Sequence, residues 1–386
     1  MAKRYPGGFI TATFKPLDPH GDYFNLYTWG SNSFGNIGTN STVSTSSPVI
    51  IGTSLTTWIS HSLTGRSAGG IKSTNNGNGS LYTWGNNADS GQLGDSTIIN
   101  KSSPTQVGSL TNWSNIGVGT NFMLAIKSDG TMWSWGSHVN GEMGDGTPNV
   151  ATGRSSPVQI GADTNWSKLA VGGAVSLVIR STGTLWSFGY NTHGALGLND
   201  RNNRSSPSII GAGTDWAFAA VGLNNSAAIK TNGTLWTWGR DLNGESGQGT
   251  LLRRSSPVQV GALTNWKYIS LSRSSTNAIA VKTDGTMWTW GGNSTGQLGN
   301  NTIVNSSTPG QVGILTNWAL VSTDGGTCIA IKTNGTLWAW GLATAGETGN
   351  NDLTNRSSPI QIGSLTNWTS LATGQNICQA ILGNPF

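Results

Sequence analysis

Short alternating runs of apolar and polar residues follow one another along this chain, and glycine-containing turns separate them. One run is NAIAVK, at Asn277 to Lys282, and an Asp-Gly turn separates it from TMWTWG, at Thr286 to Gly291. Two alternating runs on either side of Asp-Gly or Asn-Gly are typical of a β-hairpin. No stretch shows the periodicity of an amphipathic helix. The pattern therefore predicts short antiparallel strands throughout the chain.

The hairpin recurs with a period of 50 to 55 residues, and three columns of residues mark seven copies. The first column ends each hairpin with Trp-Gly or Phe-Gly, at Gly30, Gly85, Gly136, Gly189, Gly239, Gly291 and Gly341. The second is a tryptophan that usually follows Thr-Asn, at Trp58, Trp113, Trp166, Trp216, Trp266, Trp318 and Trp368. The third is a Ser-Ser-Pro or Ser-Ser-Thr-Pro corner. Repeats of this length, each a small antiparallel sheet, predict a β-propeller.

The two ends of the repeat array complement each other. FNLYTWG, at Phe24 to Gly30, has no Asn-Trp strand before it, and the last Asn-Trp strand, from Asn367, has no Trp-Gly hairpin after it. We therefore expect an all-β, seven-bladed propeller whose last blade pairs N-terminal with C-terminal strands. Residues 25–386 are assigned to this propeller and residues 1–24 to an N-terminal anchor segment.

Composition supports a packed domain and gives no sign of an active site. Charged residues make up only 10% of the chain, but 18 tryptophans are atypical of disorder. The chain has no apolar run of about 18 residues and no apolar signal-peptide core, so we expect neither a membrane span nor secretion. Its four histidines are scattered, and Cys328 and Cys378 occupy one repeat column as expected core thiols. We expect no catalytic residues, no metal site and no cofactor.

Every tryptophan belongs to the Trp-Gly column, to the Asn-Trp column, or to a further column two places before the ring of the Trp-Gly column, which indicates a structural role. In LWTWG the two rings share one strand face, because side chains alternate in a strand. Burying one ring removes roughly 150–250 Å² of surface from water. Core packing is the main expectation, and the candidates for partly exposed aromatic contacts with a partner are Trp186, Trp236 and Trp288.

Basic residues also fall into columns. One column ends the strand before the hairpin turn and has Leu382 as its seventh member; its cations are Lys72, Lys127, Arg180, Lys230, Lys282 and Lys332. A second set precedes the Ser-Ser-Pro corner, at Lys101, Arg154, Arg204, Arg254 and Arg356. Two interpretations stay open: solvated side chains that flank turns and corners, or a ring for an anionic partner. The net charge of +5 and the lack of a basic tail argue against nucleic acid.

The repeat unit, G-T-L-W-x-W-G-x-N-x-x-G-Q-L-G followed by R-S-S-P-V-Q-V-G, resembles the repeat of the RCC1 (regulator of chromosome condensation) family. The resemblance runs from about Leu26 to Leu382 in seven tandem copies. It implies a seven-bladed β-propeller, and for part of the family it implies guanine-nucleotide exchange. These repeats are too uniform to contain a specialised insertion for that activity.

The N-terminal segment MAKRYPGGFITATFKPLDP, at Met1 to Pro19, resembles the leader of virion structural proteins of tailed bacteriophages, particularly cyanophages. The alternative is an ordinary N-terminal strand that caps the propeller. The resemblance implies that Lys3, Arg4 and Tyr5 anchor the propeller to a neighbouring virion protein.

The favoured function is a non-catalytic virion component of a tail, fibre or capsid surface. Its expected partners are other virion proteins and a host-surface protein or glycan, in a symmetric multi-copy assembly. The alternative is a protein- or glycan-binding propeller, lectin- or inhibitor-like, that is soluble in the cytoplasm or outside the cell; nucleotide exchange ranks below both. The loops that vary most, at 137–153, 190–203 and 240–253, are expected to lie on one face and to bind the partner.

Overall fold

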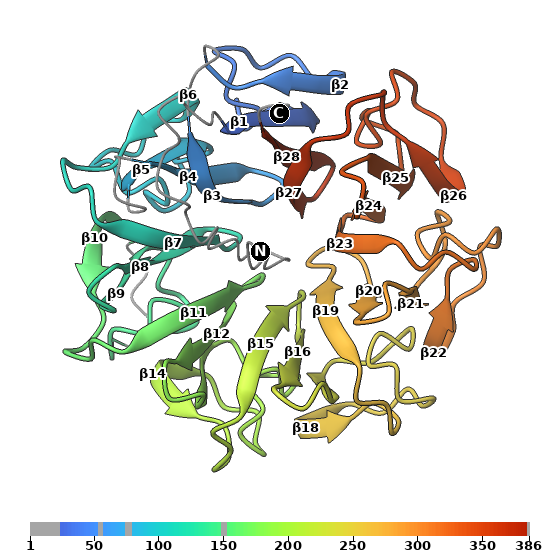
Figure 1. Cartoon of the computed structure of the whole chain (residues 1–386). Coiled ribbons are helices and arrows are strands. Elements are labelled where there is room, and N and C mark those ends of the chain that lie inside the picture. Colours follow the sequence, from blue (N-terminus) through green and yellow to red (C-terminus); the bar gives the residue numbers. More distant parts are fainter. Residues whose placement is uncertain (1–23, 53–56, 74–78, 148–152, 384–386) are drawn as a thin grey trace.

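The computed structural model describes residues 24–52, 57–73, 79–147 and 153–383. These residues form seven four-stranded blades arranged as a ring around a central axis, and the pairing of Gly79 with Trp113 joins the sheets of the first two blades (Figure 1). The strand pairings are antiparallel, and the strands of each blade, here named a to d, run in order from the axis to the circumference. Within the described ranges there is no helix, and hence none long and apolar enough to cross a membrane. The predicted all-β propeller is confirmed.

Each of the first six blades is continuous in sequence. Blade one contains β3 (Trp58–Leu63), β4 (Ser67–Ser73), β5 (Gly79–Gly85) and β6 (Lys101–Gln106). Blade two contains β7 (Trp113–Val118), β8 (Phe122–Lys127), β9 (Met132–Gly136) and β10 (Arg154–Gln159). Blade three contains β11 (Trp166–Val171), β12 (Val175–Arg180), β13 (Leu185–Gly189) and β14 (Arg204–Ile209). Blade four contains β15 (Trp216–Val221), β16 (Asn225–Lys230), β17 (Leu235–Gly239) and β18 (Arg254–Gln259). Blade five contains β19 (Trp266–Leu271), β20 (Asn277–Lys282), β21 (Met287–Gly291) and β22 (Ser306–Gln311). Blade six contains β23 (Trp318–Asp324), β24 (Thr327–Lys332), β25 (Leu337–Gly341) and β26 (Arg356–Gln361).

Blade seven joins the two ends of the described chain. Its strands are β27 (Trp368–Gly374), β28 (Ile377–Gly383), β1 (Phe24–Gly30) and β2 (Thr45–Ile50), in that order from the axis outward. Strand β1 pairs with β28 without interruption from Phe24↔Gly383 to Gly30↔Ile377. The hybrid blade expected from the complementary ends is therefore confirmed. The separate prediction that residues 1–24 form an anchor falls almost entirely outside the described residues.

Tryptophans of the Trp-Gly column fasten each blade to the loop of the preceding blade. In blade six, Trp340 Nε1 donates to the carbonyl of Gln297 in blade five at 3.0 Å. The ring fits because Gly299, with a φ of +68°, leaves room: a Cβ there would lie 2.7 Å from Trp340 Nε1. The same bond recurs from Trp29, Trp84, Trp135, Trp238 and Trp290. Phe188 packs at the equivalent position of blade three but has no N–H to donate.

The ring has two faces that carry different connections. The short a–b turns lie beside the long c–d loops, as the bond from Ser137 N to Asn121 O shows. The b–c hairpin turns lie beside the d–a connections, as the bond from Ser128 N to Asn112 O shows. We call the first surface the loop face and the second the hairpin face.

Candidate functional site

The basic column that ends each b strand is packed between aromatic rings at the hairpin face. In blade five, Lys282 Nζ lies 4.7 Å from the centroid of Trp266 and 3.5 Å from that of Trp288. Both rings lie on one side of the sheet, because Lys282 pairs with Trp266 in register and Trp288 pairs with the small Ala280. The equivalent cations lie 3.6 to 5.2 Å from two rings in the other blades, at Lys72, Lys127, Arg180, Lys230 and Lys332.

This packing differs from the solvated side chains flanking turns that were one of the two interpretations of the sequence. Lys127, Lys282 and Lys332 are only 4 to 7% exposed, and burial lowers the pKa of each ammonium group. Arg180 and Lys230 are also paired, with Asp163 and Asp215. Cation–π contacts stabilise by about 0.5–2 kcal/mol each. The column therefore stabilises the blades, and its role in binding an anionic partner stays a prediction.

The three tryptophans named as candidate contacts, Trp186, Trp236 and Trp288, are half-buried members of these stacks. Each indole N–H donates to a threonine hydroxyl of the adjacent hairpin turn, at 2.9 to 3.0 Å. Each ring also packs edge-on against the tryptophan of the a strand. The packing role is thus visible, and contact with a partner stays a prediction.

The second basic set lies at the outer corners and mostly faces aspartates of its own loop. Lys101 lies 3.4 Å from Asp95, and Arg154 lies 3.3 Å from Asp145. The same arrangement joins Arg204 to Asp200 at 2.5 Å and Arg356 to Asp352 at 2.6 Å. Among the described residues Arg254 forms no such short pair, and burial raises the pKa of the nearby Asp241 despite the Arg254 charge. Most of these cations are therefore paired with aspartates of the same chain.

Buried asparagines hold the c–d loops of the loop face in fixed shapes. In blade five, Asn293 Nδ2 donates to the carbonyls of Thr302 and Val304, both at 3.0 Å. Its Oδ1 accepts the Leu298 N–H at 2.9 Å. Asn87 and Asn32 make matching bonds in blades one and seven. The backbone conformation of these loops is therefore held by buried hydrogen bonds.

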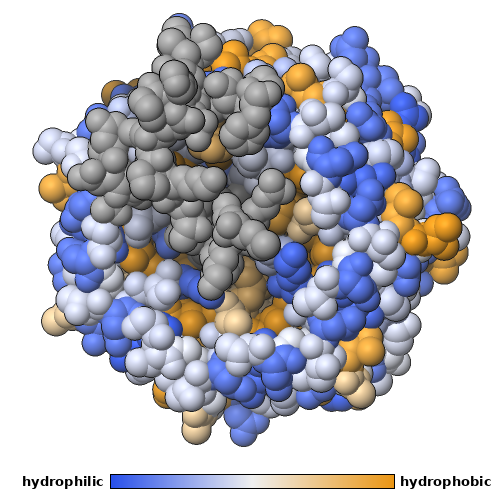
Figure 2. Space-filling view, viewed as in Figure 1, coloured by the Kyte–Doolittle hydropathy of each residue, from blue (hydrophilic) through white to orange (hydrophobic). Residues whose placement is uncertain are grey.

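Aliphatic side chains project from these fixed loops into solvent. They occupy one repeat position or the next, five or six residues before the corner proline, and are 56 to 70% exposed: Val43, Ile98, Ile99, Leu251, Leu252, Ile303, Val304 and Leu353. The backbone carbonyls of Val43, Ile99 and Val304 accept the asparagine bonds just described. Figure 2 shows apolar patches along the edge of the disc. The described parts of the predicted variable loops lie on the loop face.

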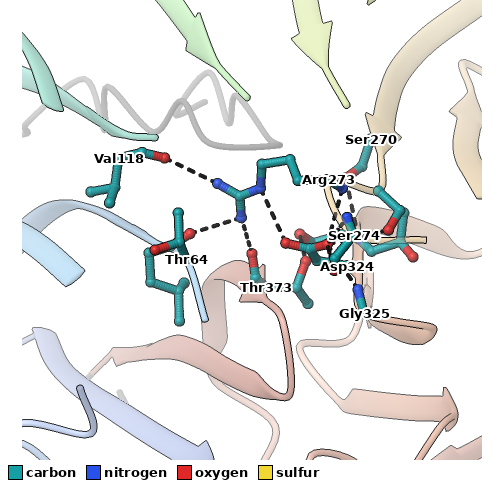
Figure 3. A network of polar contacts seen from close by, with 12 residues as sticks. Thr64, Val118, Ser270, Arg273, Ser274, Asp324, Gly325 and Thr373 are labelled. Carbon is teal, nitrogen blue, oxygen red and sulfur yellow. Dashed lines mark hydrogen bonds and ion pairs between the residues drawn. The ribbon is translucent and has the colours of Figure 1, made fainter. Parts of the chain in front are cut away.

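One arginine closes the loop-face end of the central channel. Arg273, in the a–b turn of blade five, pairs with Asp324 of blade six at 3.2 Å (Figure 3). Its guanidinium also donates to the carbonyls of Val118 at 3.2 Å and Leu63 at 2.7 Å, and to that of Thr373. One side chain thus joins blade five to blades one, two, six and seven. The channel behind it has a volume of about 70 Å³ and is lined by small and larger aliphatic residues, such as Gly117, Ala219 and Leu169.

The remaining buried titratable groups have structural partners or are held in their neutral form. Burial lowers the pKa of His61 to about 4 and raises that of Cys328 to about 12. Burial also raises the pKa of Cys378 well above its usual range. Both thiols are free and buried, in agreement with the expected core thiols. In the part of the chain that the structure describes, no three His, Cys, Asp or Glu residues form a group able to hold a metal ion.

The sequence comparisons identify the repeat. Residues 78–126, 182–229 and 284–331 match the model of the regulator of chromosome condensation (RCC1) repeat. The chain is 30% identical over 132 residues to the mitochondrial RCC1 domain-containing protein RUG3 of Arabidopsis thaliana, covering 32% of this chain and 29% of RUG3. It is 33% identical over 124 residues to the RCC2 homolog of Xenopus laevis, covering 31% of this chain and 24% of that protein. The matches therefore span less than a third of either relative.

The structural comparisons agree with this result. Yeast RCC1 (Prp20), in its structure bound to Kap60, superposes with a TM-score of 0.82 at 16% identity, covering 100% of this chain and 95% of the other. Human WBSCR16 superposes with a TM-score of 0.81 at 18% identity, covering 93% and 99%. The class of protein is thus an RCC1-like β-propeller. This particular chain contains RCC1 repeats, and each matched segment spans strands c and d of one blade and a and b of the next.

Sequence reasoning did not find the Arg273 network or the exposed aliphatic column. The signal for Arg273 is length: its turn, at 272–276, has five residues between strands, whereas the a–b turns at 119–121 and 172–174 have three. The signal for the aliphatic column is the recurrence of Ile-Ile, Leu-Leu and Ile-Val before the Ser-Ser corner. Both become visible only when the repeats are aligned against the strands.

Proposed function

We propose that this chain is a non-catalytic, protein-binding propeller that contacts its partner through the loop face. The observation that carries the proposal is the column of exposed aliphatic side chains on loops whose backbones are fixed. Displaying apolar groups in water is unfavourable, and contiguous exposed apolar patches mark interaction surfaces. A fixed loop also loses little conformational entropy on binding, which favours affinity. The aliphatic tips of the loop face suit a protein surface with matching apolar depressions.

Other partner classes have less support in the geometry. Most cations at the corners face aspartates, so the surface offers few free charges to a phosphate backbone. The half-buried tryptophans stack against cations and use their N–H groups internally, so they are poorly suited to stack on a sugar. A catalytic role would need a nucleophile, paired acid and base, or metal ligands in one cleft. Among the described residues, no three His, Cys, Asp or Glu side chains gather as a metal-binding group.

Relatives of the same fold support a protein partner. Yeast RCC1 has been solved bound to Kap60, and Prp20p of Saccharomyces cerevisiae has been studied for its binding to Gsp1p and histones. Those partners belong to those proteins, and this chain shares only 16% identity with each. The proposal therefore extends to binding a protein, without naming one. Nucleotide exchange stays a weaker alternative, and stimulated nucleotide release from a small GTPase would be its evidence.

The virion setting is a finer proposal that stands on a different segment. It rests on the resemblance of Met1 to Pro19, and Lys3, Arg4 and Tyr5 lie outside the described residues. The comparisons give no support to a virion role. Cross-linking mass spectrometry from Lys3 in the native particle tests it: links to other virion proteins would support an anchored propeller. Recovery of the protein free of stable neighbours would refute the virion role and leave the binding propeller.

The loop-face proposal has its own test. The double variant Ile303→Glu/Val304→Glu places charge on two tips that are 67 and 70% exposed, and it should reduce recovery of the native complex at least tenfold. The matched control is Ile314→Glu, because Ile314 is 91% exposed in a d–a connection on the hairpin face. Equal effects of the two variants, or an effect of the control alone, would refute the assignment of the loop face.

A further inference from the structure

A cavity of about 330 Å³ lies between the outer parts of blades three and four. Its walls are apolar, with Leu198, Ile209 and Ile210 from blade three and Pro257 from blade four. The cavity lies within the usual volume range of small ligand sites, about 300–1,000 Å³. It is on the circumference of the disc, so it does not depend on the partner proposed for the loop face.

Blade four has no side chain at a position that borders this cavity, where other blades have one. The residue three places before the a-strand tryptophan is leucine at Leu110, Leu263, Leu315 and Leu365, and Asp163 in blade three. In blade four it is Gly213. A Cβ at Gly213 would lie 3.2 Å from Trp216 Nε1 and 3.2 Å from Asp215 Oδ1. The indole N–H of Trp216 therefore faces the space that the missing side chain leaves.

The polar groups at this end of the cavity call for an uncharged acceptor. Trp216 is 6% exposed, and its Nε1, like that of the a-strand tryptophan in every other blade, has no hydrogen-bond partner within the described ranges; in blade four it faces the cavity. Lys230 Nζ, which also lines the cavity, lies 3.1 Å from Asp215 Oδ1, so the two charges balance. A buried N–H without an acceptor is unfavourable, and a carbonyl oxygen in the cavity would satisfy it. A carboxylate would instead lie beside Asp215 and be repelled.

We propose that this cavity binds an uncharged aliphatic group that carries a carbonyl, with Trp216 Nε1 donating a hydrogen bond to the carbonyl oxygen. The aliphatic part would pack between Ile210 and Pro257. The same chemistry is present in a leucine-like residue of an extended peptide and in a free aliphatic amide, and the titrations below distinguish the two sources.

The test uses the full chain labelled with ¹⁵N-tryptophan and the probe N-acetyl-leucinamide. One indole N–H resonance should shift with saturation in the millimolar range, as expected for a ligand this small. N-acetyl-glycinamide has the same carbonyl groups without the aliphatic part and should give at least a tenfold smaller effect. Gly213→Leu supplies the residue of the other blades at a φ that leucine adopts, and it should abolish the shift. A shift that persists in Gly213→Leu, or no indole shift, would overturn the proposal.

A second variant tests the same idea by creating a site. Leu263→Gly removes the equivalent leucine of blade five and should allow the probe to shift a second indole resonance, that of Trp266. If Leu263→Gly folds and no second resonance shifts, the missing side chain does not make the site and the proposal fails. A further titration distinguishes the two sources of the ligand. A leucine-containing hexapeptide that binds at least tenfold more tightly than N-acetyl-leucinamide indicates a peptide segment. Equal affinities indicate a free small amide.

Discussion

Several polar side chains in this propeller are buried among apolar groups that hold them in place. Lys282 shows the combination: its ammonium group is buried, its pKa is lowered by burial, and two tryptophan rings replace the water that it has lost. Lysine stems add apolar area to such packing. The same position holds Leu382 in blade seven, which packs beside Tyr27 and Trp368 in the same core cluster. All seven residues at this position therefore share an apolar stem, and six of them add a cation.

Replacing Lys282 with alanine tests the stacking. Lys282→Ala removes both the stem and the cation, so the free energy of unfolding should fall by about 1–3 kcal/mol in a urea titration. The control is Arg201→Ala, because Arg201 is exposed in a c–d loop, and a change within about 0.5 kcal/mol is expected. If both variants unfold at the same urea concentration, the stacking contributes nothing measurable.

His61 makes the joint between blades one and seven sensitive to acid. Its Nε2 lies 2.6 Å from Ser370 Oγ and its Nδ1 lies 3.2 Å from Gln379 Oε1. Burial lowers the folded pKa to about 4, below the unfolded value near 6.5. The unfolded chain therefore binds the proton first, and the stability from neutral His61 is complete above about pH 6.5. It is lost as the pH falls toward 4, by up to about 1.4 kcal/mol per pH unit.

Chemical denaturation across this pH range measures the effect. The wild type should lose more stability between pH 7 and pH 4.5 than His61→Gln, which does not titrate, by roughly 2–3 kcal/mol. Parallel pH profiles for the two proteins would show that His61 is not held neutral at this joint.

At the scale of elements, the glycine and tryptophan columns act together. Each Trp-Gly ring enters the neighbouring loop only where a glycine of positive φ leaves room, as at Gly299 and Trp340. The hairpin and its loop are therefore parts of one interblade contact, which explains why both columns recur in nearly every copy.

Two glycine substitutions separate backbone strain from lost packing. Gly299→Ala places a Cβ 2.7 Å from Trp340 Nε1, whereas Gly313 has a similar φ of +61° with nothing within 4 Å. Strain alone costs about 1–2 kcal/mol. We expect that cost for Gly313→Ala and at least about 2 kcal/mol more for Gly299→Ala, because the ring must move. Thermal or urea unfolding measures the stability of both variants. Equal losses of stability would contradict the role of the contact between Gly299 and the Trp340 ring.

The repeat columns made most of the fold predictable, because each column has one physical cause in all blades. The Asn-Gly and Asp-Gly turns gave the hairpins, and the complementary ends gave the hybrid blade. The environment of the basic column could not be predicted, because Lys127 and Trp133 are six residues apart and meet only across two paired strands. Arg273 was missed because its partners lie on four other blades, and a single repeat contains none of them.

At the scale of the whole molecule, the ring is held at its rim by strand pairing in blade seven and at its axis by Arg273. Asp324 is 3% exposed as a side chain and accepts N–H bonds from Arg273, Ser274 and Gly325 besides the ion pair. A buried carboxylate that loses its cation is costly, by about 3–5 kcal/mol. The axis is therefore a second closure of the ring.

Arg273→Ala should lower the free energy of unfolding by about 3–5 kcal/mol. It should also speed amide exchange where β3, β7 and β27 reach the axis, because Leu63, Val118 and Thr373 lose a donor. Arg66→Ala breaks an exposed pair with Asp89 and should change stability by less than about 1 kcal/mol. Similar values for the two variants, with unchanged exchange at the axis, would show that Arg273 does not close the ring.

Site-specific photo-cross-linking in the native source tests whether the loop face binds a protein. A benzophenone side chain replaces Ile303 on the loop face in one experiment and Ile314 on the hairpin face in another, since both positions are well exposed. We expect one defined cross-linked protein from position 303 and none from position 314. The cross-link from position 303 should disappear when position 304 carries Glu. The same adducts from both positions, or adducts from 314 alone, would contradict the claim.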